Sequence, residues 1–295
     1  MTVLVGYSPQ ESGSAALELG VVMARSLGEP LVVTTVVASP YLDIQAPVDG
    51  DYRALLRQWA DRSLAQARSK VPTDIDCAFE VTEATSISAG LSDAAERHVV
   101  SVVVLGSSAK GLTGRITLGS VIDALTHGAR WPLALAPRGY RAAEDERIDR
   151  LTVLFSHTHA LDRLLAPARD LGQRLDVSVR FASFLVRPLK REAGLIEPSA
   201  DDLVVSAWAE RMRSELATVV RERVGGDRGE ERFVVGDGLT WAEAATDIPW
   251  REGDLALIGA ASGAPLSRVF LGLRASKIVR SVPVPVLLMP RGAGA

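Results

Sequence analysis

The feature that most constrains the fold is an internal duplication: shifted by 153 residues, the chain aligns with itself, so that Gly106 falls on Gly259. Glycines and prolines have special backbone roles, and matches of these residues at one shift indicate a repeated domain. The other matched positions are Gly119 with Gly272, Pro132 with Pro285, and Pro137–Arg138–Gly139 with Pro290–Arg291–Gly292. A period this long predicts two whole domains rather than a solenoid of short repeats.

The two predicted domains span residues 1–140 and 150–295, because each starts with a similar apolar strand, "TVLVGYS" or "LTVLFSH". The segment "RGYRAAEDERIDR", residues 138–150, lies between them and is highly charged. Such a polar stretch is typical of a linker.

Strands and helices alternate in each half, judged by apolar periodicity. The first half predicts strands at 3–6, 31–37, 77–81, 102–105 and 133–136, and helices at 12–27, 50–69, 87–98 and 120–129. The second predicts strands at 152–155, 177–185, 232–235, 255–258 and 286–289, and helices at 161–174, 203–224, 241–245 and 273–282. This order predicts an α/β fold of two tandem doubly wound domains, each with a five-stranded, mainly parallel sheet.

Composition excludes several classes of function. The formal net charge of −3 gives no basic surface for nucleic acid, and the apolar runs are too short to cross a membrane. The first residues predict no signal peptide. Cys77 is the sole cysteine, which excludes an internal disulfide and predicts a cytoplasmic protein.

The stretch "VVVLGSSAKGLTGRITLGSVIDAL", residues 102–125, reads as a strand, a small-residue loop and a helix start. Backbone N–H groups and the helix dipole favour an anion at such a place, so the loop is a candidate phosphate site. A structural interpretation stays open beside it, in which Gly106 permits a turn and Ser120 caps the helix.

This loop and the order of elements resemble the universal stress protein family over the whole chain, as a tandem pair. The family's nucleotide-binding pattern is Gly, two residues, Gly, nine residues, Gly, then Ser or Thr. The resemblance implies a nucleotide site, with ATP as the expected ligand, formed by Ser8, Val36, Gly106, Ala109, Gly119, Ser120 and Val121. It also implies that the last strands, "PLALAP" and "PVLLMP", pair across a pseudo-twofold axis, making an intramolecular pseudo-dimer.

The chain departs from the family pattern at several positions. Ala109 replaces the second glycine of the first half, and Ser8 stands where nucleotide-binding members have Asp. The second half has Ser262 for the second glycine, Leu273 for the final hydroxyl residue and Ser156 after its first strand. Because a leucine would block the approach of phosphate to the helix, we expect a nucleotide in the first domain only.

Two functions therefore follow from the sequence: a stress-response regulator or protective protein that binds nucleotide, or a scaffold that acts through protein partners without nucleotide. A weak ATP hydrolase ranks last because no general base is evident near the loop, so we predict no catalytic residues and no enzyme. His157 and His159 lack the further ligands of a metal site, and none is predicted. Arg115 is expected to be structural rather than phosphate-binding.

Overall fold

The computed structural model describes residues 1–39, 49–128, 130–155, 158–186, 233–259 and 273–290, with a few single positions between 210 and 222. The first half contains β1 (Thr2–Gly6), α1 (Glu11–Leu27), β2 (Leu31–Ala38), α2 (Asp49–Arg68), β3 (Cys77–Ala84), α3 (Ile87–His98), β4 (Val100–Gly106), α4 (Ser120–Gly128) and β5 (Leu133–Ala136). The second contains β6 (Arg150–Leu154), α5 (Thr158–Leu175), β7 (Ser178–Val186), β8 (Phe233–Gly238), α7 (Trp241–Asp247), β9 (Asp254–Gly259), α8 (Leu273–Ser281) and β10 (Val286–Met289). The predicted helix at 203–224 falls mostly outside the described residues.

Local sequence signals explain several helix ends. Helix α1 ends at Gly28, which has a left-handed φ of 65° that a glycine adopts without steric strain. Helix α3 begins after Ser86, whose hydroxyl accepts the Ala89 N–H at 3.1 Å. Helix α7 begins in the same way after Thr240, so a side-chain hydroxyl caps each of these two helices.

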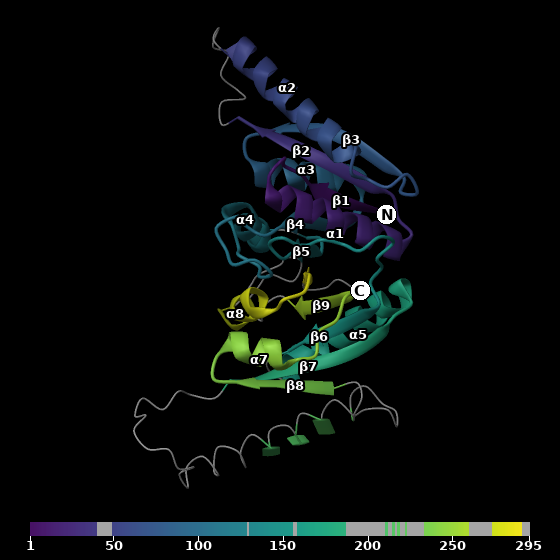
Figure 1. The fold of residues 1–295 in the computed structure, drawn as a ribbon, viewed down its shortest axis with the longest axis vertical. Helices are drawn as coiled ribbons and strands as arrows, with labels where there is room; N and C mark the ends of the chain where they lie inside the picture. The colour runs from purple at the N-terminus through teal and green to yellow at the C-terminus, as the bar shows by residue number, and fades with distance from the viewer. Residues whose placement is uncertain are drawn as a thin grey trace, which may run out of the picture.

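The described strands form one ten-stranded sheet in the order β3-β2-β1-β4-β5-β10-β9-β6-β7-β8. Within each half all neighbouring strands are parallel, and the second half repeats the order of the first in reverse across the sheet. The predicted α/β class and the two five-stranded halves are therefore confirmed. Figure 1 shows the halves one above the other, with β3 and β8 at the two outer edges.

The halves join through β5 and β10, which are antiparallel. Leu135 is opposite Val286, and Leu133 is opposite Leu288. Leu135 and Leu288 are 0% and 1% exposed, so the predicted pairing of the last strands is confirmed. The reversal of direction at this pair makes the halves symmetric about the join.

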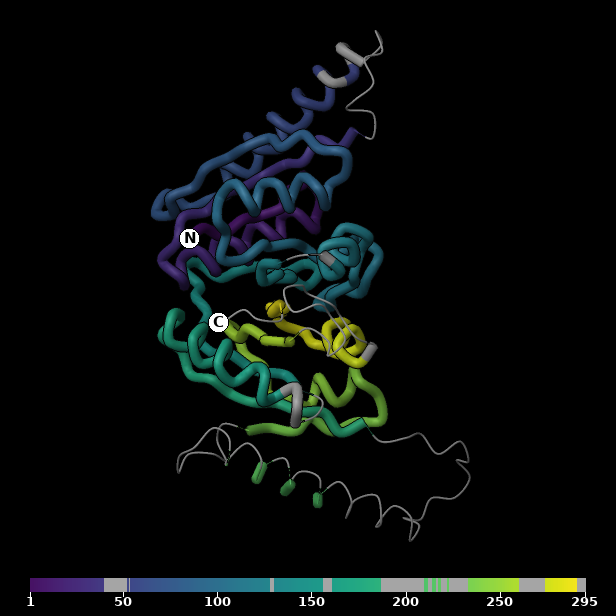
Figure 2. The backbone as a smooth tube through the Cα atoms, turned by 180° about the vertical axis from the view of Figure 1, so that it is seen from behind, coloured from purple at the N-terminus to yellow at the C-terminus, as the bar shows by residue number. Residues whose placement is uncertain are grey.

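Two layers of helices cover the sheet, and each encloses a core that crosses the join (Figure 2). Residues of α1, α2 and α5 fill the core on one face, and residues of α3, α4 and α8 fill the other. Along β5, Leu133 and Leu135 belong to the second core, whereas Ala134 and Ala136 belong to the first. This alternation follows from the two-residue period of a strand covered on both faces.

The charged segment 138–150 connects β5 to β6 and is fastened to α1. The Glu18 carboxylate accepts the Ala142 N–H at 2.8 Å, and the Ser26 hydroxyl accepts the Ile148 N–H at 2.8 Å. The Asp149 N–H donates to the Gly253 carbonyl of the second half at 2.8 Å. The linker is thus tied to both halves, while the domain limits at 140 and 150 stay a prediction.

Helix α2 is only partly packed against the sheet. Leu64 is 7% exposed and packs on the sheet, but Tyr52, Leu55 and Trp59 are 57%, 56% and 40% exposed. Figure 1 shows the start of α2 extending beyond the sheet.

We expect Leu135→Ala to lower the free energy of unfolding by about 2–5 kcal/mol, because it leaves a cavity in a core shared by both halves. Leu112→Ala is the matched control, since Leu112 is 78% exposed and should change stability by less than about 0.5 kcal/mol. Urea denaturation of both variants tests this. A loss below about 1 kcal/mol for Leu135→Ala would contradict the central role of the join.

Candidate functional site

The candidate site lies where the strand order reverses. The chain leaves β1 toward β2 on one side, and leaves β4 toward β5 on the other, so the carboxyl ends of β1 and β4 form a switch point. Ligands of open α/β sheets bind at such points, because the two loops diverge there. Ser8 follows β1, and Gly106 ends β4.

The backbone of α1 brings these two strand ends together. A Cβ on Gly106 would overlap the carbonyl oxygen of Ser12, and a Cβ on Gly13 would overlap the carbonyl oxygen of Ser8. The end of β1, the first turn of α1 and the end of β4 are therefore in direct contact. Gly106 is needed for this packing, whether or not a ligand is bound.

Two of the other predicted residues lie on one face of the sheet. Val36 of β2 and Val121 of α4 are half-buried, and both pack against the core that contains α3 and α4. A Cβ on Gly90 of α3 would lie 2.6 Å from Cγ1 of Val36, so α3 rests closely on this valine. The structure thus places Val36 at the flank of the site rather than in its loop.

Hydrogen bonds close the base of the loop between Gly106 and Gly119. They join Ser107 and Ser108 to Thr117, three residues to which the sequence analysis assigned no role. The Ser107 side chain is buried, and its hydroxyl accepts the Thr117 N–H at 2.8 Å. The Ser108 N–H donates to the Thr117 carbonyl at 3.0 Å. Buried Ile116 adds an apolar anchor, so the loop returns to α4 in a defined position.

Arg138 holds the outer part of the loop. Its guanidinium donates to the Gly111 carbonyl and to the Glu11 carboxylate, and its own carbonyl accepts the Gly114 N–H at 2.8 Å. The sequence contained a signal for this role, because Arg138 belongs to the "PRG" string that both halves share. The repeated string singled out Arg138, but it did not indicate that this side chain binds the loop.

Gly119 is the N-cap of α4, since its carbonyl accepts the Asp123 N–H at 2.9 Å. Ser120 is exposed and is the first helical residue. A Cβ on Gly119 would meet only Ser108, at an ordinary contact distance of 3.4 Å. Internal packing therefore does not require glycine at position 119, in contrast to Gly106.

Ala109 is exposed and is not among the described residues with positive φ. The expected steric strain of an alanine at this position would arise only at positive φ, so this conformation of the loop carries no such strain. The positive φ of the loop, 73°, is at Gly114 instead. Ala109 differs from glycine here only by a methyl group that a ligand would meet.

The corresponding site of the second half falls mostly outside the described residues. Gly259 is described, and a Cβ on it would lie 2.9 Å from the Leu164 side chain. Ser156, His157 and the segment 260–272, which includes Ser262 and Gly272, are not described. Leu273 begins α8. Within the described part of the chain, no group of three or more metal-binding side chains occurs.

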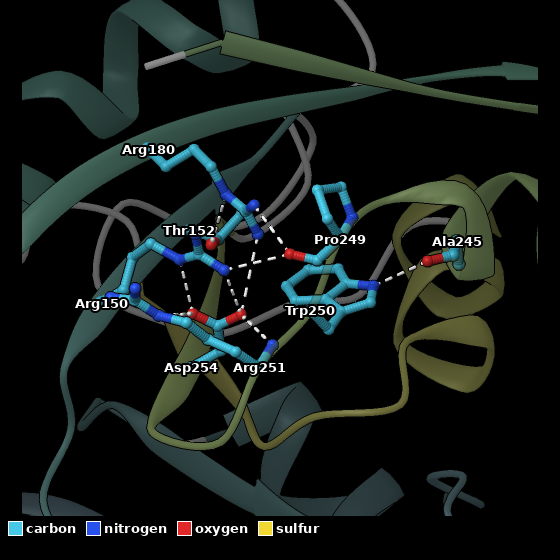
Figure 3. Close-up of polar contacts among 8 residues, drawn as sticks. All are labelled: Arg150, Thr152, Arg180, Ala245, Pro249, Trp250, Arg251 and Asp254. Carbon is cyan, nitrogen blue, oxygen red and sulfur yellow. Dashed lines mark hydrogen bonds and ion pairs between the residues drawn. The ribbon is translucent and has the colours of Figure 1, made fainter. Parts of the chain in front are cut away.

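A second polar cluster surrounds Asp254 at the amino ends of β6, β7 and β9 (Figure 3). The Asp254 side chain is 0% exposed, and its carboxylate accepts two hydrogen bonds from Arg150, at 2.6 and 2.7 Å. Arg180 lies 3.7 Å from Asp254 and donates to the Thr152 hydroxyl at 3.2 Å. The geometry of the cluster is that of a buried structural ion pair.

Burial is the largest cause that lowers the pKa of the Arg180 guanidinium, the charge of neighbouring Arg150 adds to the decrease and Asp254 opposes it, which together give a pKa of about 10. The Arg180 guanidinium also lies over the Trp250 ring, 5.4 Å from its centroid. At neutral pH Arg180 is charged, so its positive charge depends on Asp254 for compensation.

The fold and the loop at the switch point define a duplicated doubly wound α/β protein. The model of the universal stress protein family matches residues 1–137. A universal stress protein from Mycobacterium tuberculosis is 33% identical over 300 residues, covering 98% of this chain and 100% of that protein. The chain therefore belongs to the universal stress protein family.

The fold is similar to that of a solved structure that covers nearly the whole chain. A universal stress protein from Archaeoglobus fulgidus covers 99% of this chain and 98% of its own, with a TM-score of 0.61 at 16% identity. A universal stress protein crystallised in complex with cAMP covers 47% of this chain and 97% of its own, with a TM-score of 0.33 at 21% identity. Among the helices of the described residues, none has the length and hydropathy to cross a membrane.

We expect Asp254→Asn to lower the free energy of unfolding by about 3–5 kcal/mol, because it leaves buried Arg180 and half-buried Arg150 without their counter-ion. Asp93→Asn is the matched control, since Asp93 is exposed on α3. Thermal and urea unfolding of both variants measure the difference. Equal stability of the two variants would show that the cluster is not an important structural ion pair.

Proposed function

We propose that this protein is a stress-response regulator or protective protein that binds ATP or a related nucleotide in its first half. The phosphates would lie between the loop after β4 and the start of α4. There the first N–H groups of a helix have no partner within the helix, and they carry the positive end of its dipole. The proposed activity is binding, and no residue of the described site is given a catalytic role.

The observation that carries this proposal is the contrast between Gly106 and Gly119. A side chain at position 106 would overlap the carbonyl oxygen of Ser12, whereas a Cβ at position 119 would meet only the Ser108 side chain, at an ordinary contact distance of 3.4 Å. A glycine without an internal steric reason at an exposed helix start fits a backbone that a ligand approaches closely. Lys110 and Arg115 lie on the same loop, but Arg115 already has a protein partner in Thr246.

We propose no nucleotide for the second half. Leu273 stands where the pattern requires a hydroxyl, and an alkyl side chain cannot form a hydrogen bond to a phosphate oxygen. The first half keeps more of the nucleotide-binding pattern, because Ser120 is present and Ala109 adopts an unstrained conformation.

The alternative is a scaffold that acts through protein partners. Exposed Tyr52, Leu55 and Trp59 on α2 favour it, because aromatic side chains are enriched at protein interfaces. Ser8 also favours it, since a serine lacks the carboxylate that would accept hydrogen bonds from a ribose. Calorimetry with ATP separates the two functions.

Gly119→Asp should reduce ATP affinity by at least about 100-fold, because it places a carboxylate where the phosphates would bind. Isothermal titration calorimetry at one fixed magnesium concentration measures this. Gly28→Asp is the matched control: Gly28 has open space around it at the far end of α1, and Asp tolerates its left-handed φ. If Gly119→Asp is folded and binds ATP as the wild type does, the ligand lies elsewhere.

Ser8→Asp should increase ATP affinity by about 5- to 30-fold, because the new carboxylate accepts hydrogen bonds from ribose hydroxyls. Ala109→Gly should increase ATP affinity by less than about 5-fold, since it relieves only the crowding by one methyl group and no positive φ is involved. Equilibrium titration of both variants and the double variant tests this order. No gain in a folded double variant would favour the scaffold.

A further inference from the structure

The second half contributes a side chain to the loop of the first. Arg115, on the loop between β4 and α4, donates from Nη2 to Oγ1 of Thr246 at 3.1 Å. Thr246 belongs to α7, on the other side of the β5–β10 join. The two residues are 131 positions apart in the sequence, so only the joined sheet brings them together.

The Thr246 hydroxyl is already oriented by its own helix. It donates to the Ala242 carbonyl at 2.8 Å, which leaves its oxygen lone pairs available to accept from Arg115. A hydroxyl with its proton engaged in this way is a fixed acceptor rather than a free rotor.

Helix α7 is itself held in place from two sides. A Cβ on Gly236 of β8 would overlap the Ala244 carbonyl, so α7 lies directly on the strand. The Trp250 ring nitrogen donates to the Ala245 carbonyl at 2.7 Å, one residue before Thr246. Figure 3 shows this tryptophan between α7 and the guanidinium of Arg180.

The Asp254 cluster completes this anchor. Both Arg150 and Arg180 donate to the carbonyl of Pro249, at 3.1 and 3.0 Å, which fixes the turn that precedes Trp250. Contacts therefore run from buried Asp254 through this turn to the end of α7, and from Thr246 to the loop of the first half. The last contact is the one that reaches the candidate phosphate site.

On the loop, Arg115 is held through its backbone as well. Its carbonyl accepts the Arg138 N–H at 3.0 Å, and its N–H donates to the Leu112 carbonyl at 3.2 Å. The hydrogen bond from the Arg115 side chain to Thr246 thus links the loop to the second half.

We infer that the second half supports the nucleotide loop of the first half, with Arg115 and Thr246 as its positioning residues. This inference rests on the proposed nucleotide site. A ligand that binds an ordered loop does not have to order it, so the support increases nucleotide affinity. Loss of this one charge-assisted hydrogen bond, which is exposed to solvent, should raise the Kd for ATP about two- to tenfold.

Thr246→Val and Thr246→Ser test the inference. Valine keeps the shape and removes the acceptor, whereas serine keeps the hydroxyl. Hydrogen–deuterium exchange of the full chain without nucleotide should be faster in residues 108–118 for Thr246→Val and unchanged for Thr246→Ser. The Kd for ATP should follow the same order, with Thr246→Ser restoring the wild-type value.

Arg174→Gln is the control for a general weakening of the contacts between the two halves. Arg174 pairs with Glu29 across the halves at 2.8 Å, and its loss should leave exchange at 108–118 unchanged. Arg115→Gln combined with Thr246→Val should have no more effect than either change alone, because both remove one bond. Wild-type exchange at 108–118 in Thr246→Val would overturn the inference, whereas absence of ATP binding by the wild type would overturn the proposed function alone.

Discussion

The rest of the structure depends on the antiparallel pairing of β5 with β10. Each half ends its sheet in a strand of four residues, and an open edge of this kind would present unpaired N–H and C=O groups together with apolar side chains. Pairing the two edges satisfies those groups and buries Leu135 and Leu288 almost completely. The two hydrophobic cores then extend across the join, so neither half has a core that is independent of the other.

The direction of that pairing has a consequence for the candidate site. Because β5 and β10 run in opposite directions, the carboxyl ends of the first half's strands lie at the same edge of the sheet as the amino ends of the second half's strands. The loop after β4 lies at the carboxyl ends of the first half's strands. The Asp254 cluster, Trp250 and the end of α7 lie at the amino ends of the second half's strands. A parallel join would have separated them, and Arg115 would not reach Thr246.

This arrangement gives the second half a use even if it binds no nucleotide. A duplicated domain that loses its own ligand chemistry still supplies the partner edge and a rigid helix beside the remaining loop. The replacement of the motif's hydroxyl residue by Leu273 is then compatible with keeping the whole fold. The ion pairs of buried Asp254 with Arg150 and Arg180 contribute to that rigidity, since a buried ion pair tolerates little displacement of either partner.

Much of the fold could be predicted from the sequence, because duplication and alternating apolar patterns are local or periodic signals. The order of strands and helices, the apolar last strands and the loop that ends at Gly119 are all visible in this way. Only the tertiary structure decided which contacts these elements make. It showed that Gly106 makes room for the Ser12 carbonyl and that Ala109 is unstrained. It also revealed the bond between Arg115 and Thr246, and the exposure of Trp59 despite its helical spacing. These facts depend on residues far apart in the chain, whose approach is set by sheet order and strand direction and therefore has no periodic trace in a single sequence.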